Sequence, residues 1–138
     1  MPTPTFTLLV DDDQTTNYLN QRTLEKLAVT DKVLVARNGQ QALEQLAAHS
    51  QHTTPDCPAL IFLDMNMPVM SGLEFLEAYQ QLPRIGHAII IVMLTTPLLP
   101  EKMRRLRQLP VTDILNKPLT VEKVAGVLKT YFAPGQPG

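Results

Sequence analysis

The chain has 138 residues, 44% hydrophobic and 18% charged, which is typical of one folded domain with one core. The formal net charge of −1 offers no basic footprint for nucleic acid or an anionic membrane, and the single cysteine, Cys57, excludes an internal disulfide. The first residues lack the pattern of a signal peptide and no run is long enough to span a bilayer, so we expect a cytoplasmic protein.

Strand-like and helix-like segments alternate five times along the chain. Short apolar or β-branched runs predict strands at residues 6–10, 32–36, 59–63, 88–94 and 111–115. One-face apolar spacing predicts helices over residues 15–28, around 42–47, from Gly72 to about 79, over 100–109 and around 121–128. This alternation indicates a parallel sheet that is covered on both faces. We expect a single domain with a core over about residues 6–132 and a short flexible tail, residues 133–138.

Polar side chains collect where the predicted strands end. Asp11 and Asp12 follow the first strand, Asp64 the third and Thr95 the fourth, while Lys117 comes just after the fifth. The carboxyl ends of parallel strands lie on one edge of a sheet, where ligands bind. The sequence therefore predicts one small site with three carboxylates, a hydroxyl and an ammonium group.

Such a carboxylate cluster requires positive charge, because like charges repel and burial adds to the cost. Lys117 supplies one charge, and oxygen ligands from Asp12, Asp64 and a backbone carbonyl suit Mg²⁺ as a second source. The sequence has no thiolate or histidine cluster that would suggest zinc. Beside a metal, Asp64 becomes a nucleophile for phosphoryl transfer, with Lys117 and Thr95 contacting the phosphoryl oxygens.

Four runs of sequence carry a resemblance to a known family. They are LLVDDD (8–13), IFLDMNMPVMSG (61–72), IVMLTTP (91–97) and DILNKPLT (113–120). In this order they resemble the signature blocks of two-component response-regulator receiver domains, in particular stand-alone, single-domain receivers. The resemblance extends from about Phe6 to Phe132. It implies a flavodoxin-like, doubly wound α/β fold, with a five-stranded parallel sheet in the order 2-1-3-4-5 and five helices.

The resemblance also implies a metal site and a phosphoacceptor. Asp64 is expected to accept the phosphoryl group. Asp12 and Asp64 are expected to bind Mg²⁺ (or Mn²⁺) directly, Asn66 through its backbone carbonyl, and Asp11 through water. For the trio Asp11 to Asp13 considered alone, a helix N-cap with acidic first-turn residues is equally plausible, and Asp13 is left as a capping or surface residue.

The remaining matched residues form the expected switch. Thr95 resembles the switch hydroxyl, Lys117 the lysine that contacts the phosphoryl group, and Pro118 the proline after a cis peptide bond. Ile114 stands where many members carry an aromatic residue that moves inward on activation, and Leu119 replaces a frequent phenylalanine. The chain therefore lacks the aromatic half of the usual switch, although Ile114 can still repack.

The resemblance implies a signalling switch and not an enzyme, apart from removal of its own phosphoryl group. A sensor histidine kinase or a histidine phosphotransfer protein is the expected donor, and the fourth and fifth βα units are expected to change the face that binds an unidentified downstream protein. We expect no nucleic-acid or membrane partner, and a monomer or weak dimer. The alternative is a non-phosphorylated pseudo-receiver, which usually lacks an acidic residue or the lysine; none is missing here.

A basic run near the fourth strand is open to two interpretations. It contains Lys102, Arg104, Arg105 and Arg107. We interpret it as the solvated face of a helix, with a partner-docking surface as the less favoured alternative.

Overall fold

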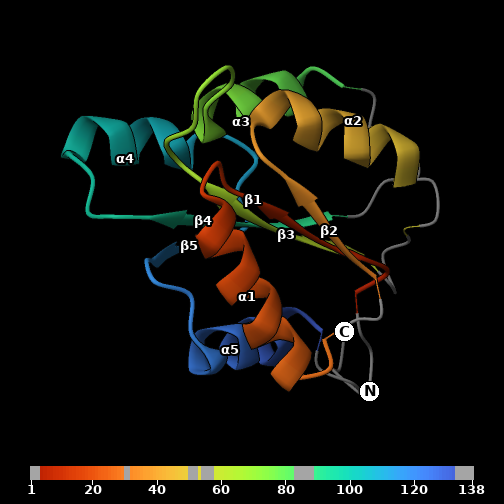
Figure 1. The fold of residues 1–138 in the computed structure, drawn as a ribbon. Coiled ribbons are helices and arrows are strands. Elements are labelled where there is room, and N and C mark those ends of the chain that lie inside the picture. The colour runs from red at the N-terminus through yellow and green to blue at the C-terminus, as the bar shows by residue number, and fades with distance from the viewer. Residues whose placement is uncertain (1–3, 30–31, 50–52, 54–57, 83–88, 133–138) are drawn as a thin grey trace.

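The computed structural model describes residues 4–29, 32–49, 53, 58–82 and 89–132 (Figure 1). Five parallel strands form one sheet in the order β2-β1-β3-β4-β5, which confirms the expected topology. The strands are β1 (Thr7–Val10), β2 (Val33–Ala36), β3 (Ala59–Asp64), β4 (Ile89–Thr95) and β5 (Asp113–Asn116). The helices are α1 (Gln14–Lys26), α2 (Gly39–His49), α3 (Gly72–Gln80), α4 (Pro100–Arg107) and α5 (Val121–Tyr131).

Helices cover both faces of the sheet, α2, α3 and α4 on one side and α1 and α5 on the other (Figure 1). Every residue of the central strand β3 is buried, and its successive side chains enter two different cores. Ile61 and Leu63 pack in the cluster that includes α2, α3 and α4, whereas Leu60 and Phe62 pack in the cluster that includes α1 and α5. Burial on both faces explains why this strand shows no alternation of polar and apolar residues.

Several elements end at positions that the hydrophobic pattern alone did not indicate. The first helix ends at Lys26 and not at Ala28, which has a left-handed φ of 49°. The fourth helix ends at Arg107, and a turn around Pro110 follows, in which the Val111 amide donates to the Leu109 carbonyl. The last strand therefore starts two residues later than predicted. The proposed tail, residues 133–138, lies outside the described residues, and within them no helix is long and apolar enough to cross a membrane.

Phe62 contributes the largest side chain of β3 to the core, and it is 1% exposed. Truncating a buried phenylalanine removes apolar burial and leaves a cavity. We expect Phe62→Ala to lower the free energy of unfolding by about 3–5 kcal/mol, measured by urea denaturation with far-UV circular dichroism. Leu19→Ala is the control, because Leu19 is 56% exposed on α1 and its loss should cost less than about 1 kcal/mol. Equal losses in both variants would contradict the assigned core.

Candidate functional site

The strand ends bring three aspartates together at one edge of the sheet. Asp11 and Asp12 directly follow β1, and Asp64 is the last residue of the neighbouring strand β3. One carboxylate oxygen from each of the three lies within 4.8 Å of the others. Asp11 and Asp64 are buried, whereas Asp12 is exposed. The structure thus places the three carboxylates that the sequence singled out in one cluster.

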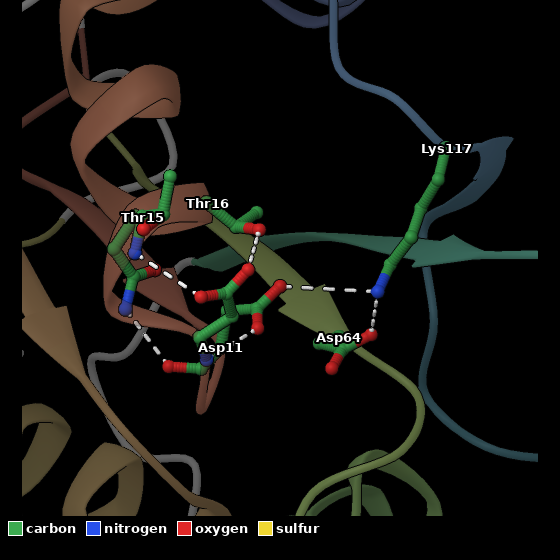
Figure 2. Close-up of polar contacts among 7 residues, drawn as sticks. Asp11, Thr15, Thr16, Asp64 and Lys117 are labelled. Atoms are coloured by element: carbon green, nitrogen blue, oxygen red, sulfur yellow. Dashed lines mark hydrogen bonds and ion pairs between the residues drawn. The ribbon is translucent and has the colours of Figure 1, made fainter.

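Lys117 joins this cluster from the segment after β5. Figure 2 shows its side chain directed toward Asp64 and Asp11. Its Nζ lies 2.5 Å from Asp64 Oδ1 and 3.8 Å from Asp11 Oδ2. The Lys117 amide donates to the Thr95 carbonyl over 2.9 Å, so the backbone is held against the end of β4, and the Lys117–Pro118 peptide bond is cis. The ammonium group therefore forms ion pairs with two of the three carboxylates.

The protonation equilibria reflect this crowding. Burial alone would lower the pKa of Lys117, but the attraction of Asp64, Asp11 and Asp12 outweighs it and raises the pKa above its ordinary value. The pKa of the Asp11 carboxyl is raised, first by burial and then by the charges of Asp64 and Asp12. The Asp13 amide, which donates to Asp11 Oδ1 over 2.9 Å, and the Lys117 charge oppose that rise only in part. Lys117 therefore stays charged at neutral pH, and the repulsion at Asp11 is not fully compensated.

The donor set fits a hard divalent cation. Three carboxylates against one ammonium group leave a formal excess of two negative charges. Asp64 Oδ1 is buried, and its partner among the described residues is the Lys117 ammonium group 2.5 Å away. Carboxylate oxygens with room for water are the ligands that Mg²⁺ prefers. Asn66, the expected source of a carbonyl ligand, lies exposed two residues beyond Asp64.

Thr95 lies at the same edge of the sheet, where its carbonyl accepts from the Lys117 amide, while its hydroxyl has a different partner. It is the last residue of β4, in register with Asn116 of β5, and it is 1% exposed. Its hydroxyl donates to the Thr96 carbonyl over 2.8 Å. Ile114, on β5, is half-buried and packs against the core on the α4 side. Ile114 thus faces the layer that includes α4, and Thr95 ends the strand that precedes this helix in the chain.

Asp13 has the capping role that was left open for it. It is the N-cap of α1, accepting from the Thr15 amide over 3.2 Å and from the Thr16 hydroxyl over 2.6 Å. These donors, the Thr16 hydroxyl first, lower the pKa of Asp13. Its carboxylate therefore serves the helix and is separate from the Asp11, Asp12 and Asp64 cluster.

Two residues that sequence reasoning missed position the aspartates. Asn17 is buried in the first turn of α1, and its Nδ2 donates to the Asp11 carbonyl over 2.8 Å. An asparagine on the inner face of an amphipathic helix was the available signal for this. Gly72 begins α3, where its amide donates to the Met65 carbonyl over 2.9 Å. A Cβ at Gly72 would lie 2.4 Å from the Asp64 carbonyl oxygen, so only glycine allows this close approach.

We expect Gly72→Ala to displace the backbone of Asp64, lowering both the stability of the fold and the reactivity of the Asp64 carboxylate. Gly126→Ala is a matched control, because a Cβ at Gly126 in α5 would meet nothing within 4 Å. That control should raise the free energy of unfolding by about 0.5–1 kcal/mol, since alanine is the better helix former. Urea denaturation and labelling by acetyl phosphate check both variants. A Gly72→Ala protein that behaves like the control would show that the close approach has no consequence.

Comparisons with known proteins agree with this geometry. Residues 7–129 match the family model of the response regulator receiver domain. The chain is 32% identical to a probable methanogenesis regulatory protein, FilR2 of Methanothrix harundinacea, over 86% of this chain and 76% of that protein. It is 30% identical to a probable chemotaxis protein CheY of Rhizobium etli, over 91% of this chain and 90% of that protein.

A solved structure gives the same result. The crystal structure of chemotaxis protein CheY4 from Vibrio cholerae matches with a TM-score of 0.73 and 28% identity, over 94% of this chain and 99% of that one. Fold, family model and relatives therefore agree with the resemblance carried by the four sequence blocks. The chain belongs to the response regulator receiver domains of two-component systems, which are signalling modules and not enzymes in the usual sense.

Proposed function

We propose that Asp64 accepts a phosphoryl group from a sensor histidine kinase or a histidine phosphotransfer protein, and that this modification switches the surface near α4. The observation that carries the proposal is the pairing of a buried, nucleophilic carboxylate with the Lys117 ammonium group, 2.5 Å away, inside a cluster of three aspartates. Membership of a family whose receivers are phosphorylated by sensor histidine kinases supports it.

In the proposed step a carboxylate oxygen of Asp64 attacks the phosphorus of a phosphohistidine. An O–P bond forms as the N–P bond breaks, and the imidazole leaves with the electron pair. Lys117 stabilises the negative charge that the arriving oxygens bring to the site. Asp12, Asp64 and the Asn66 carbonyl would hold Mg²⁺ directly and Asp11 through water, and the bound ion would supply further positive charge to offset the negative charge of those oxygens.

Phosphorylation is expected to act on the rest of the molecule through Thr95. Its hydroxyl now donates to the Thr96 carbonyl, and a phosphoryl oxygen on Asp64 would compete for that hydrogen. If the hydroxyl turns, the Thr96 backbone loses its partner at the start of the segment that leads to α4. Ile114 has no hydroxyl, so it can respond only by repacking. The switch is therefore a population shift in the β4–α4 and β5 region.

The proposal is tested by incubating the chain with acetyl phosphate and following its intact mass. We expect one added phosphoryl group, only when Mg²⁺ is present, and its release by hydroxylamine, which cleaves acyl phosphates. Mn²⁺ should substitute for Mg²⁺. A chain that takes no label at millimolar metal, with acetyl phosphate or with a phosphorylated histidine phosphotransfer protein, would support the non-phosphorylated pseudo-receiver instead.

A further inference from the structure

A hollow lies next to the aspartate cluster, on the face of the sheet that α1 and α5 cover. It has a volume of about 220 Å³, and Asp11 and Lys117 line it as well as belonging to the cluster. Its α1 wall has four residues spaced as neighbours on one helix face, which are Thr16, Leu19, Asn20 and Thr23. Residues 117–119, which lead from β5 to α5, form the facing wall, and Figure 2 shows Lys117 opposite Thr16. The hollow therefore separates α1 from the segment before α5.

Much of the wall of this hollow is apolar. Leu94 of β4 and Leu119 both line it and are 4% and 8% exposed, as part of the core on this side of the sheet. Leu19 and Pro118 also line it, and both are exposed. Water molecules in such a space find few polar partners, so an apolar group displaces them at little cost. The hollow is therefore suited to a ligand with an apolar body.

Asn20 places an unpartnered amide group in this apolar wall. It is 8% exposed, and its side chain forms no hydrogen bond with the described part of the chain. The neighbouring hydroxyls are already engaged, because Thr16 donates to the Asp13 carboxylate over 2.6 Å and Thr23 donates to the Leu19 carbonyl over 3.1 Å. A buried amide without partners destabilises a fold, and it has donors as well as an acceptor to offer. Asn20 is therefore suited to a ligand group that can both accept and donate.

The charges around the hollow favour a neutral ligand. Asp11 is a buried carboxylate in its wall, so an anion there would be repelled. The Lys117 ammonium group would repel a cation, and it is not free to hold an anion, because it is paired with Asp64 and Asp11. A molecule without net charge avoids both repulsions and can still form hydrogen bonds with Asn20.

We propose that this hollow binds a small neutral molecule with an amide-type group, hydrogen-bonded to Asn20, on a compact apolar body that packs against Leu94 and Leu119. The volume equals the space of about seven water molecules in the liquid, which suits a ligand the size of one substituted ring. The proposal goes beyond the proposed function, because it concerns a second ligand and holds whether or not Asp64 carries a phosphoryl group.

The test titrates the isotope-labelled full chain with benzamide and follows its amide resonances by NMR. Toluene, which has no polar group, and benzoate, which is an anion, are the comparison probes. We expect benzamide to shift the Asn20 side-chain resonances to saturation, and toluene and benzoate to bind about tenfold more weakly or less. Asn20→Leu should weaken benzamide binding about tenfold without weakening toluene binding. Leu119→Phe should abolish binding by filling the hollow, whereas Leu82→Phe, the same change at a position that is 44% exposed, should leave it unchanged.

Three outcomes overturn the proposal: no saturable shift with benzamide, binding of benzoate as tight as that of benzamide, or unchanged benzamide binding in Asn20→Leu. The last comparison decides the matter even if Leu119→Phe does not fold. Labelling by acetyl phosphate is measured separately on the original chain. A chain that takes the label but does not bind benzamide would contradict only the ligand site, and a chain that binds benzamide but takes no label would contradict only the proposed phosphorylation.

Discussion

Asp64→Asn is expected to abolish labelling of the chain by acetyl phosphate and Mg²⁺. An amide oxygen is a far weaker nucleophile than a carboxylate, and the other two carboxylates of the cluster, Asp11 and Asp12, belong to a different strand end. The loss should be complete, beyond the detection limit of intact-mass measurement, because the proposal assigns the covalent bond to one residue. The fold should persist, since asparagine has nearly the same volume.

Asp13→Asn is the matched control for this experiment. It removes an aspartate from the same acidic run, but asparagine remains a good N-cap and can still accept from the Thr15 amide. We expect normal labelling and a free energy of unfolding close to that of the original chain. Labelling that persists undiminished in Asp64→Asn would refute the assignment of the phosphoacceptor. Labelling lost in both variants would indicate that the acidic run as a whole is required.

Asp11→Asn is expected to have opposite effects on the metal-free and the metal-bound protein. Burial and the charges of Asp64 and Asp12 raise the pKa of Asp11, so its folded form holds a proton more tightly than its unfolded form. Stability is therefore lost as pH rises from the ordinary pKa through the raised one, and the cost persists at neutral pH. Removing this charge should stabilise the metal-free fold by about 1 kcal/mol at neutral pH, with a smaller gain in acid, where Asp11 is already protonated.

The same substitution should weaken Mg²⁺ binding by about 10–100-fold, the usual effect of losing a group that acts through a metal's water. Urea denaturation with and without MgCl₂ measures both effects, because a ligand that binds only the folded chain raises its stability. Asp11→Asn should be the more stable protein without metal and should gain less from added Mg²⁺. Asp13→Asn, which keeps the cluster intact, should respond as the original chain does. An original chain that gains no stability at millimolar Mg²⁺ would contradict the metal site.

Much of the fold follows from the sequence because the signals are local. Runs such as ALIFL and AIIIVML can bury all of their apolar side chains only when both faces of the strand are covered. This requires helices on both sides of a parallel sheet. That arrangement places every strand's carboxyl end on one edge. The meeting of Asp11, Asp12, Asp64 and Lys117 is therefore predictable from where each residue stands relative to its strand.

The tertiary structure alone decided the finer features, because they depend on the exact backbone path at each strand end and turn, which an apolar pattern does not specify. The position of the Thr95 hydroxyl, the support that Asn17 gives to Asp11, and the close approach of Gly72 to Asp64 are of this kind. Helix ends likewise follow the local backbone, as at the turn around Pro110 and the left-handed φ of Ala28. A local pattern shows which residues are apolar and which are charged, but the partner that each side chain meets is set by packing across the whole sheet.

The same distinction applies to the basic run on α4. Its composition is visible in the sequence and is equally consistent with a solvated helix face or a docking surface. Only the fold shows that Arg105 is paired with Glu77, and that Arg104 and Arg107 lie exposed. The sequence by itself determined the family, the topology and the membership of the acidic site. The structure decided which charges are compensated, because electrostatic partners are brought together only when distant segments pack.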